Sequence, residues 1–152
     1  MKYFSESNLE LKYAKKGDAG LDLPFYDPEL EVVTLNPGES FAFKTGMHIA
    51  IPEGCVGFLD SRSSTSKLKL DLLCRTIDEG FRGNIKLCFI NLSKEPVVVK
   101  RGDCLAQIIM MDLSKDRELN RVSSIEDLGI TERQFGEFGS TGNASHLEGK
   151  DE

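Results

Sequence analysis

Short apolar segments, repeated about every ten residues, constrain the fold of this chain more than any other feature. Gly, Pro, Asn or Asp residues separate these segments, and almost no stretch carries a helical periodicity. This spacing is typical of an all-β sandwich or barrel. The segments predicted to be strands are Glu31–Leu35, Ser40–Lys44, Met47–Ile51, Val56–Leu59, Leu68–Leu73, Ile85–Asn91, Pro96–Val99 and Cys104–Leu113.

Two of the predicted strands, Lys86–Asn91 and Leu105–Met111, are apolar on both faces. Strands of this kind are buried on both sides, either within a two-sheet core or against another subunit. The polar stretch Ser114–Gly129 is the linker candidate, and within it Ser123–Glu126 fits a capping box with one helical turn. We expect this stretch to act as a tether, which gives the segment after it reach toward a distant or neighbouring site.

Length and charge narrow the class of protein. The 152 residues fall within the length range of a single domain with a core of its own, and 39% hydrophobic and 29% charged residues are ordinary for a globular protein. The net charge of −6 argues against binding nucleic acid polymers, whereas a single nucleotide needs only a few cations. No leader-like segment and no apolar run of membrane-spanning length is present, so we expect no membrane partner.

Cysteine and histidine usage argues against disulfides and zinc. The cysteines lie apart, in apolar surroundings and without a CxxC pair: Cys55, Cys74, Cys88 and Cys104. Only His48 and His146 could add histidine ligands. We therefore expect buried thiols in a reducing compartment, and a cytoplasmic location.

The segment from residue 133 to 142 combines three glycines with Arg133, Phe138, Ser140 and Thr141, and it shows no apolar periodicity. Glycines let backbone N–H groups approach a ligand, hydroxyls add donors, and arginine is a forked cation suited to phosphate. The pattern predicts a flexible arm, residues 131–152, that closes over a nucleotide bound by the domain of residues 1–130. The alternative is a disordered polar tail, which is the commoner fate of Gly/Ser-rich termini.

Three polar positions lie within or beside the predicted strands. Asp22 lies between apolar residues, Arg62 is followed by hydroxyl residues where a strand ends, and Gln107 lies near the start of a strand. Each has a functional and a structural interpretation. Asp22 can be a buried structural carboxylate, the serines after Arg62 can cap a short helix, and Gln107 can be an ordinary exposed strand residue.

Residues Thr76–Gly83 are predicted to form a β-hairpin, with Asp78 before the turn and Phe81 after it. Ile77 precedes the carboxylate, so Asp78 is expected among apolar groups beside the turn. A carboxylate in such surroundings is suited to act as a general base.

Taken together and in order, these five segments resemble the five motifs of the homotrimeric dUTPase family (deoxyuridine triphosphate nucleotidohydrolases). The match extends from about Lys15 to Gly142 and covers most of the chain. Its most specific pieces are Ile77–Gly83, Gly102–Gln107 and Phe138–Gly142.

The resemblance implies hydrolysis of dUTP to dUMP and pyrophosphate by attack of water on the α-phosphorus. Asp78 stands at the family's aspartate that orients and deprotonates this water and contacts the sugar 3′-hydroxyl. Phe81 takes the place of an aromatic residue that packs beneath the deoxyribose and excludes a 2′-hydroxyl, and hence UTP. Thr76, Ile77 and Lys86 belong to the same expected substrate site.

The phosphates are expected to meet a second set of residues. Arg62, Ser63 and Ser64 match the family's phosphate-gripping segment, and Gln107 matches a residue that holds the α-phosphate or the attacking water. The resemblance thus implies Asp78, Gln107 and Arg62 as the catalytic residues. The expected arm contacts complete the substrate site, with Phe138 stacking on uracil and the hydroxyls meeting the γ-phosphate: Arg133, Phe138, Gly139, Ser140 and Thr141.

The resemblance also implies Mg²⁺, held by the three phosphates and by water rather than by direct protein ligands, with Asp22 acting through water. The implied fold is a jelly-roll-like, distorted β-barrel. Three chains form a homotrimer with three shared active sites. One subunit supplies the hairpin with Asp78, a second the Arg62 segment and a third the arm.

The chain departs from the family pattern at Arg75, where glycine is usual, at Leu72–Cys74, and at Gln134 and Glu137 in the arm. Two other functions stay open. One is a nucleotide-sensing or protein-binding regulator with this fold and little turnover, for which the Arg75 region is the reason. The other is dCTP deamination, which needs an acid/base near the exocyclic amine, whereas Glu79 in a hairpin faces away from its neighbour.

Overall fold

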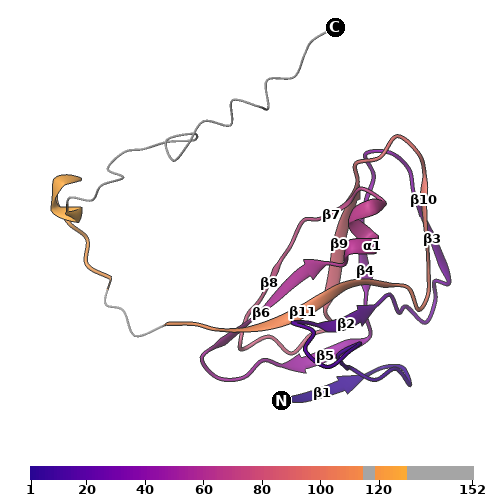
Figure 1. The fold of residues 1–152 in the computed structure, drawn as a ribbon, viewed down its shortest axis with the longest axis horizontal. Helices are drawn as coiled ribbons and strands as arrows, with labels where there is room; N and C mark the ends of the chain where they lie inside the picture. Colours follow the sequence, from indigo (N-terminus) through magenta and orange to yellow (C-terminus); the bar gives the residue numbers. More distant parts are fainter. Residues whose placement is uncertain (115–118, 130–152) are drawn as a thin grey trace, which may run out of the picture. The chain divides into compact units, whose positions relative to one another are not determined.

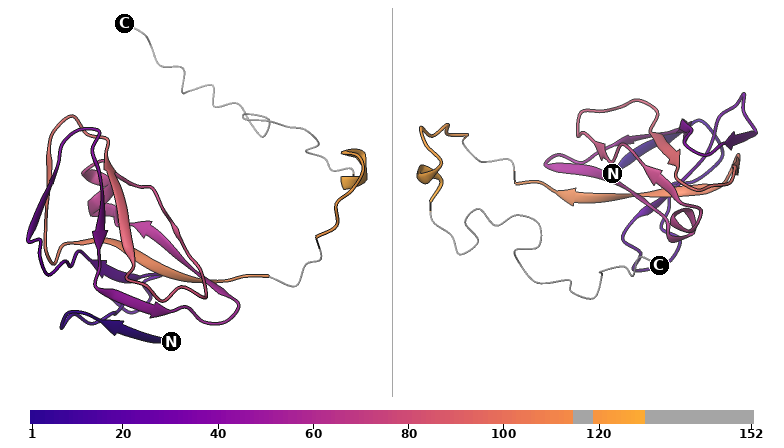
Figure 2. Two further views of the ribbon diagram at one scale, coloured as in Figure 1. Left: turned by 180° about the vertical axis from the view of Figure 1, so that it is seen from behind. Right: turned by 90° about the horizontal axis from the view of Figure 1, so that it is seen from above.

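The computed structural model describes residues 1–114 and 119–129 (Figures 1 and 2). The chain divides into two compact units, residues 1–115 and residues 116–152. In the described part of the second unit, the one element is the 3-10 helix η1 (Glu126–Leu128). The predicted domain boundary at residue 130 stays a prediction.

The first unit is built from short antiparallel strands in four small sheets, as Figure 1 shows. The largest sheet has the order β2-β11-β6-β8, and a second has the order β4-β9-β7. Two pairs, β1-β5 and β10-β3, complete the unit, which confirms the predicted all-β, jelly-roll-like class. The strands are β1 (Lys2–Ser5), β2 (Leu21–Pro24), β3 (Val32–Leu35), β4 (Ser40–Lys44), β5 (Met47–Ala50), β6 (Cys55–Ser61), β7 (Leu70–Leu72), β8 (Thr76–Ile77), β9 (Lys86–Asn91), β10 (Val97–Lys100) and β11 (Cys104–Asp112).

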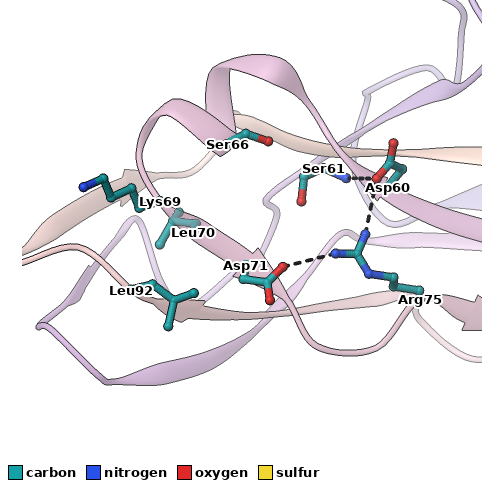
Figure 3. A pocket seen from close by; sticks show the side chains of 8 residues that line it. All are labelled: Asp60, Ser61, Ser66, Lys69, Leu70, Asp71, Arg75 and Leu92. Atoms are coloured by element: carbon teal, nitrogen blue, oxygen red, sulfur yellow. Dashed lines mark hydrogen bonds and ion pairs between the residues drawn. The ribbon is translucent and has the colours of Figure 1, made fainter. Parts of the chain in front are cut away.

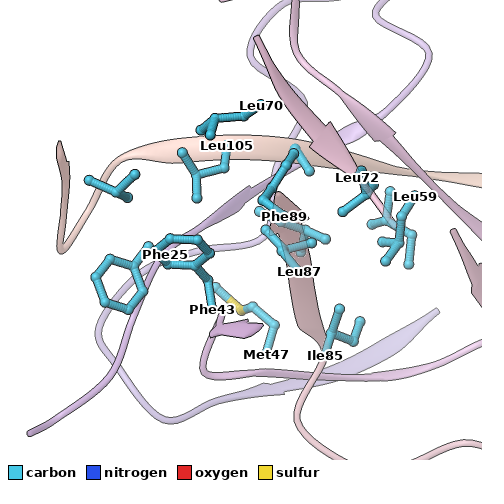
Figure 4. Packing of buried hydrophobic residues seen from close by; sticks show 14 of the residues in the cluster. Phe25, Phe43, Met47, Leu59, Leu70, Leu72, Ile85, Leu87, Phe89 and Leu105 are labelled. Atoms are coloured by element: carbon cyan, nitrogen blue, oxygen red, sulfur yellow. The ribbon is translucent and has the colours of Figure 1, made fainter. Parts of the chain in front are cut away.

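The core lies between the sheets and is rich in aromatic and branched side chains, as Figure 4 shows for one part of it. Phe43 contacts Phe25 and Phe89 edge to face, with ring centroids 5.1 and 6.4 Å apart. Alternation along each strand produces this packing, since every second residue points inward. In β9, for example, Leu87 and Phe89 are fully buried.

The two strands that are apolar on both faces bury only one face within the single chain. On β9 the outward residues Cys88 and Ile90 are half-buried, and on β11 Ile109 is half-buried while Met111 is exposed. Burial of both faces within a two-sheet core is therefore not met in the single chain, and burial against another subunit stays a prediction.

The predicted β-hairpin at Thr76–Gly83 is wrong. A turn is present, since Phe81 N donates to Asp78 O at 3.0 Å, but the strands on its two sides do not pair. Instead β8 pairs with β6, and β9 pairs with β4 and β7 in another sheet. The chain crosses between two sheets here, so the turn alone did not determine the pairing.

The expected capping box at Ser123–Glu126 is also wrong, although a single helical turn is present as η1. The residue at the N-cap is Ile125, and it makes no side-chain capping bond. Asp127 Oδ2 instead accepts from Ser124 N at 3.1 Å. Across the described residues, no helix has the length and apolar character needed to span a membrane.

Candidate active site

A row of polar side chains crosses the four-stranded sheet. Gln107 of β11 lies opposite Asp22 of β2 on one side and opposite Asp60 of β6 on the other. Directly opposed residues of antiparallel strands share a face of the sheet, so these three side chains lie together. Apolar neighbours along each strand, such as Leu59 and Ile108, are buried in the core, which turns the polar row outward.

Gly20, just before β2, is the close neighbour that fixes the Gln107 side chain. A Cβ at this position would lie 2.6 Å from Gln107 Oε1 and 2.8 Å from Gln107 Cβ. Only glycine therefore leaves room for the amide in its present place. The position of Gly20 directly before the strand of Asp22 is visible in the sequence, but its contact with Gln107 depends on strand pairing.

Arg62 lies between the end of β6 and the short helix α1 (Ser63–Lys67). Two hydrogen bonds fasten this junction to β11, since Leu105 O accepts from Thr65 Oγ1 at 2.7 Å and from Arg62 N at 3.3 Å. The guanidinium is thereby held near β2, with its Nε 3.4 Å from Asp22 Oδ1. The alternative interpretation, in which the serines after Arg62 cap a short helix, is partly right. A short helix does follow Arg62, but no side chain caps it.

These residues line a pocket of about 440 Å³. Three of the expected motifs meet in it, which brings Asp22, Arg62, Ser63 and Gln107 together. Ser64 lies exposed on α1 and is not part of the lining. The remaining lining residues were not predicted as site residues: Ala14, Asp18, Gly20, Ser61 and Ser66. A guanidinium, hydroxyls and an amide make this pocket suited to a phosphorylated ligand.

Cys104, at the start of β11, is close to the ion pair of Asp22 and Arg62. Burial, followed by the negative charge of Asp22, raises the pKa of the Cys104 thiol, while Arg62 acts in the opposite direction. A raised pKa keeps the group in its thiol form, which is neither a nucleophile nor a metal ligand. The chemistry of this pocket therefore belongs to the other polar groups.

A second pocket, of about 430 Å³, adjoins the first through Ser61 and Ser66 (Figure 3). Arg75 lies between two carboxylates there, with Nη1 3.2 Å from Asp60 Oδ1 and Nη2 3.1 Å from Asp71 Oδ1. The arginine that departs from the family pattern thus forms a paired, part-exposed bridge between β6 and β7.

The turn that carries Asp78 and Phe81 lies apart from the first pocket. Asp78 is exposed, so the expectation that apolar groups surround it is not met within the single chain. Phe81 is 41% exposed, and its ring lies on Gly83, where a Cβ would be 2.6 Å from Phe81 Cζ. The carboxylate of Glu79 points elsewhere and accepts from Gly54 N at 3.1 Å.

The single chain therefore brings together only part of the predicted site. None of the residues expected around the sugar and the base lines the first pocket: Thr76, Ile77, Asp78, Phe81 and Lys86. The predicted arm contacts lie outside the described residues: Arg133, Phe138, Gly139, Ser140 and Thr141. Over the parts of the chain that the structure describes, no group of three or more His, Cys, Asp or Glu side chains is placed to hold a metal ion.

Comparison with known proteins gives one consistent family. The family model described as dUTPase matches residues 9–142. A deoxyuridine 5′-triphosphate nucleotidohydrolase of Neorickettsia sennetsu is 39% identical over 140 residues, which cover 89% of each protein. The protein of the same name from Mycobacterium leprae is 38% identical over 137 residues, covering 88% of this chain and 86% of the relative.

Solved structures give the same result. A mutant dUTPase of Staphylococcus bacteriophage 80alpha with dUpNHpp superposes with a TM-score of 0.76 at 27% identity, covering 93% of this chain and 98% of that one. A mutant dUTPase of phage phi11 of S. aureus, described with a structural Mg(II) ion, has a TM-score of 0.70 at 27% identity and covers 82% and 97%.

Proposed function

The chain belongs to the dUTPase family and hydrolyses dUTP to dUMP and pyrophosphate, and we propose that the pocket of Asp22, Arg62 and Gln107 is where the triphosphate reacts. The observation that carries the proposal is the meeting of three family motifs in one pocket of about 440 Å³. Water attacks the α-phosphorus, and pyrophosphate leaves.

Each polar group of the pocket has a task that its chemistry suits. The Arg62 guanidinium binds phosphate oxygens and stabilises the charge that develops on the leaving pyrophosphate. Its ion pair with Asp22 keeps the guanidinium oriented before substrate arrives. The Gln107 amide, fixed by Gly20, can donate to an α-phosphate oxygen or hold the attacking water, and Ser63 adds a donor at the same edge.

Asp78 is proposed as the base that orients and deprotonates the water, with Phe81 packed against the deoxyribose. Because the turn of Asp78 does not line the pocket of Arg62, these residues cannot act on one substrate within one chain as described. A homotrimer resolves this, since the Asp78 turn of one subunit can complete the Arg62 pocket of another.

An apolar surface beside the site supports such an assembly. Beyond Asp60 and Gln107, the same face of β6 and β11 continues as two cross-strand pairs, Phe58 with Ile109 and Val56 with Met111. These side chains are half-buried, apart from the exposed Met111. Burial of this face in a subunit interface would remove its apolar surface from water and place the second subunit next to the pocket.

Mg²⁺ is proposed as the cofactor. Asp22 is the expected metal-linked carboxylate, and its Oδ1 lies 3.4 Å from Arg62 Nε. Because the guanidinium occupies this oxygen, Asp22 would act through water on an ion held mainly by phosphate oxygens and water. Mg²⁺ would neutralise charge on the phosphates when bound. The arm, residues 131–152, is proposed to close over the substrate and exclude water.

A substrate panel tests this function. The chain is incubated with dUTP, dCTP, dTTP and UTP in the presence of Mg²⁺, and pyrophosphate and ammonia are assayed separately. Pyrophosphate from dUTP alone is expected. Ammonia from dCTP would favour the deaminase, and binding without release of either product would favour the regulator; the comparisons favour neither.

A further inference from the structure

His48 lies at the junction of three segments that are far apart in the sequence. Its Nε2 is 2.8 Å from Glu6 Oε1, next to β1, and its Nδ1 is 2.8 Å from the backbone oxygen of Arg82. Both partners are oxygens that can only accept, because one is a carboxylate and the other a carbonyl. A neutral imidazole has one N–H, so only the imidazolium can donate to both at the same time.

The segment that His48 holds is the turn of Asp78 and Phe81. Arg82 closes this turn on itself, since its Nη1 donates to Glu79 O at 2.6 Å and to Phe81 O at 2.7 Å. The carbonyl of the same residue accepts from His48. A change at His48 therefore acts on the turn at its C-terminal end, directly after Phe81.

Asn84, two residues after Arg82, shares Glu6 Oε1 with His48 but also has an anchor that does not involve the histidine, the N–H of Thr45. Asn84 Nδ2 donates to Glu6 Oε1 at 3.1 Å, and Asn84 Oδ1 accepts from Thr45 N at 3.2 Å. The chain after the turn is thus anchored whatever the charge on the histidine. Loss of the bond from His48 would release the carbonyl of Arg82, and with it the turn, without releasing β9.

From this geometry we propose that His48 is a positioning residue for dUTP hydrolysis, which in its doubly protonated form holds the Asp78–Phe81 turn in place. The inference rests on the proposed roles of Asp78 and Phe81. It makes turnover sensitive to pH on the alkaline side, where the imidazolium loses a proton.

The surrounding charges favour the imidazolium. The hydrogen bond to Glu6, followed by the bond to the Arg82 carbonyl, raises the pKa of His48 above its ordinary 6.5, against desolvation. The bond from His48, followed by that from Asn84, lowers the pKa of Glu6. Lys44 also faces Glu6 and is itself paired with Asp27, Nζ to Oδ2, at 3.0 Å.

The sign of the pH effect follows from the direction of these shifts. A raised pKa in the folded state means that the contribution of His48 is complete below about 6.5 and is lost as the pH rises through the raised value. The lowered pKa of Glu6 means that its carboxylate stays charged until the pH falls well into the acid range. The turn is therefore held from mildly acidic pH up to the raised pKa of His48 and is released as the pH rises through that pKa.

The first measurement follows the histidine itself in the whole 152-residue chain. The chain has two histidines, so two Cε1–H resonances titrate in a proton NMR experiment, and His48→Gln identifies which belongs to His48. We expect that resonance to titrate above 6.5 and to shift to lower pH in Glu6→Gln. Glu31→Gln is the matched control, because Glu31 lies next to β3, away from His48, with 83% of its side chain exposed.

The second measurement is the pH profile of turnover on dUTP. In the unaltered chain kcat should fall as the pH rises through the NMR value, and in Glu6→Gln this decline should move to lower pH by the same amount. In His48→Gln, kcat at neutral pH should fall roughly tenfold, since one bond to a charged donor is lost, with less change in KM, and the alkaline decline should vanish. A decline that stays in place while the NMR value moves would overturn the proposal.

Hydrogen exchange of the amides of residues 78–83 gives a readout that needs no turnover. At neutral pH, exchange of these amides should be faster in His48→Gln than in the unaltered chain. In Glu31→Gln it should proceed at the same rate as in the unaltered chain. Unchanged exchange in His48→Gln would overturn the positioning role even if dUTP is hydrolysed. A chain that shows the exchange difference but releases no pyrophosphate would contradict the proposed function instead.

Discussion

At the scale of single residues, Asp78 is the group on which the proposed chemistry depends most. Asp78→Asn keeps the size of the side chain and removes the base, so nucleotide affinity should change little while kcat falls by about 10²–10⁴-fold. Steady-state kinetics and binding of a non-hydrolysable dUTP analogue measure the two effects. Glu31→Gln, at an exposed carboxylate of the same unit that lines neither pocket, serves as the control and should keep its rate. Near-normal turnover in Asp78→Asn would remove the residue from the mechanism.

Gly20 offers a test of the pocket wall. Gly20→Ala places a Cβ 2.6 Å from Gln107 Oε1 and 2.8 Å from Gln107 Cβ, so either the amide or the strand must move. We expect a loss of about 1–3 kcal/mol in the free energy of unfolding and a clear fall in kcat, since the amide no longer meets the phosphate. Denaturant unfolding and kinetics measure both.

Gly80→Ala is the matched control for the stability effect. Apart from its own chain neighbours, no atom lies within 4 Å of a Cβ built at Gly80, so this change should not destabilise the protein. An equal loss of stability in the two variants would show that crowding against Gln107 is not the cause.

Site residues could be predicted where a short stretch of the sequence marks them, and not where only the fold brings them to the pocket. Asp22, Arg62 and Gln107 each stand in a motif that can be identified within a few residues, and all three line the pocket. Ala14 and Asp18 line it as well, but no local pattern marks them, because only the path of the chain before β2 brings them there. The surroundings of Asp78 were predicted wrongly for the same reason, since a neighbouring isoleucine in the sequence does not determine burial.

At the scale of single elements, helix α1 ends at an unusual residue. Lys69, which follows the C-cap residue Leu68, adopts φ +56° and is the only non-glycine residue in the described part of the chain with a positive φ. Its N–H donates to Ser66 O at 3.0 Å, as at the end of many helices, where glycine is preferred. The side chain of Lys69 therefore costs conformational energy at this position.

Lys69→Gly should stabilise the protein by about 1 kcal/mol, because glycine adopts this conformation without steric cost. Lys67→Gly makes the same replacement inside α1, where it should destabilise by about 1 kcal/mol. Denaturant unfolding of both variants measures the difference, and the opposite signs separate backbone conformation from loss of a lysine charge. A destabilised Lys69→Gly would contradict this account.

Strands could be predicted from periodicity, whereas their partners could not. Each of the eight predicted strands overlaps an observed strand, and Ser40–Lys44 has the predicted ends. The strand β1 was missed, since Lys2–Ser5 is short and exposed and its pairing with β5 is its main support. The predicted hairpin failed because β8 and β9 each find a better partner in different sheets, which is a long-range choice.

At the scale of the whole molecule, the fold explains why the pocket is incomplete in one chain. The polar row of Asp22, Gln107 and Asp60 lies on the same face of the sheet as the apolar pairs of β6 and β11. A subunit that covers the apolar part of this face necessarily lies beside the polar part. Assembly and completion of the active site are therefore proposed to be one event, and a stable, active monomer would contradict both.

Mixing two inactive variants tests the shared site directly. Asp78→Asn and Arg62→Ala should each lose most activity alone, since each removes one half of every site. If the halves come from different subunits, trimers re-formed from an equal mixture contain some sites with an intact Asp78 from one chain and an intact Arg62 from another. For random assembly about a quarter of the sites are intact, so about a quarter of the unaltered rate should return. Activity should stay absent when the two proteins are mixed without dissociation. If each site is instead built within one chain, no mixture restores turnover, because every chain lacks one of the two groups.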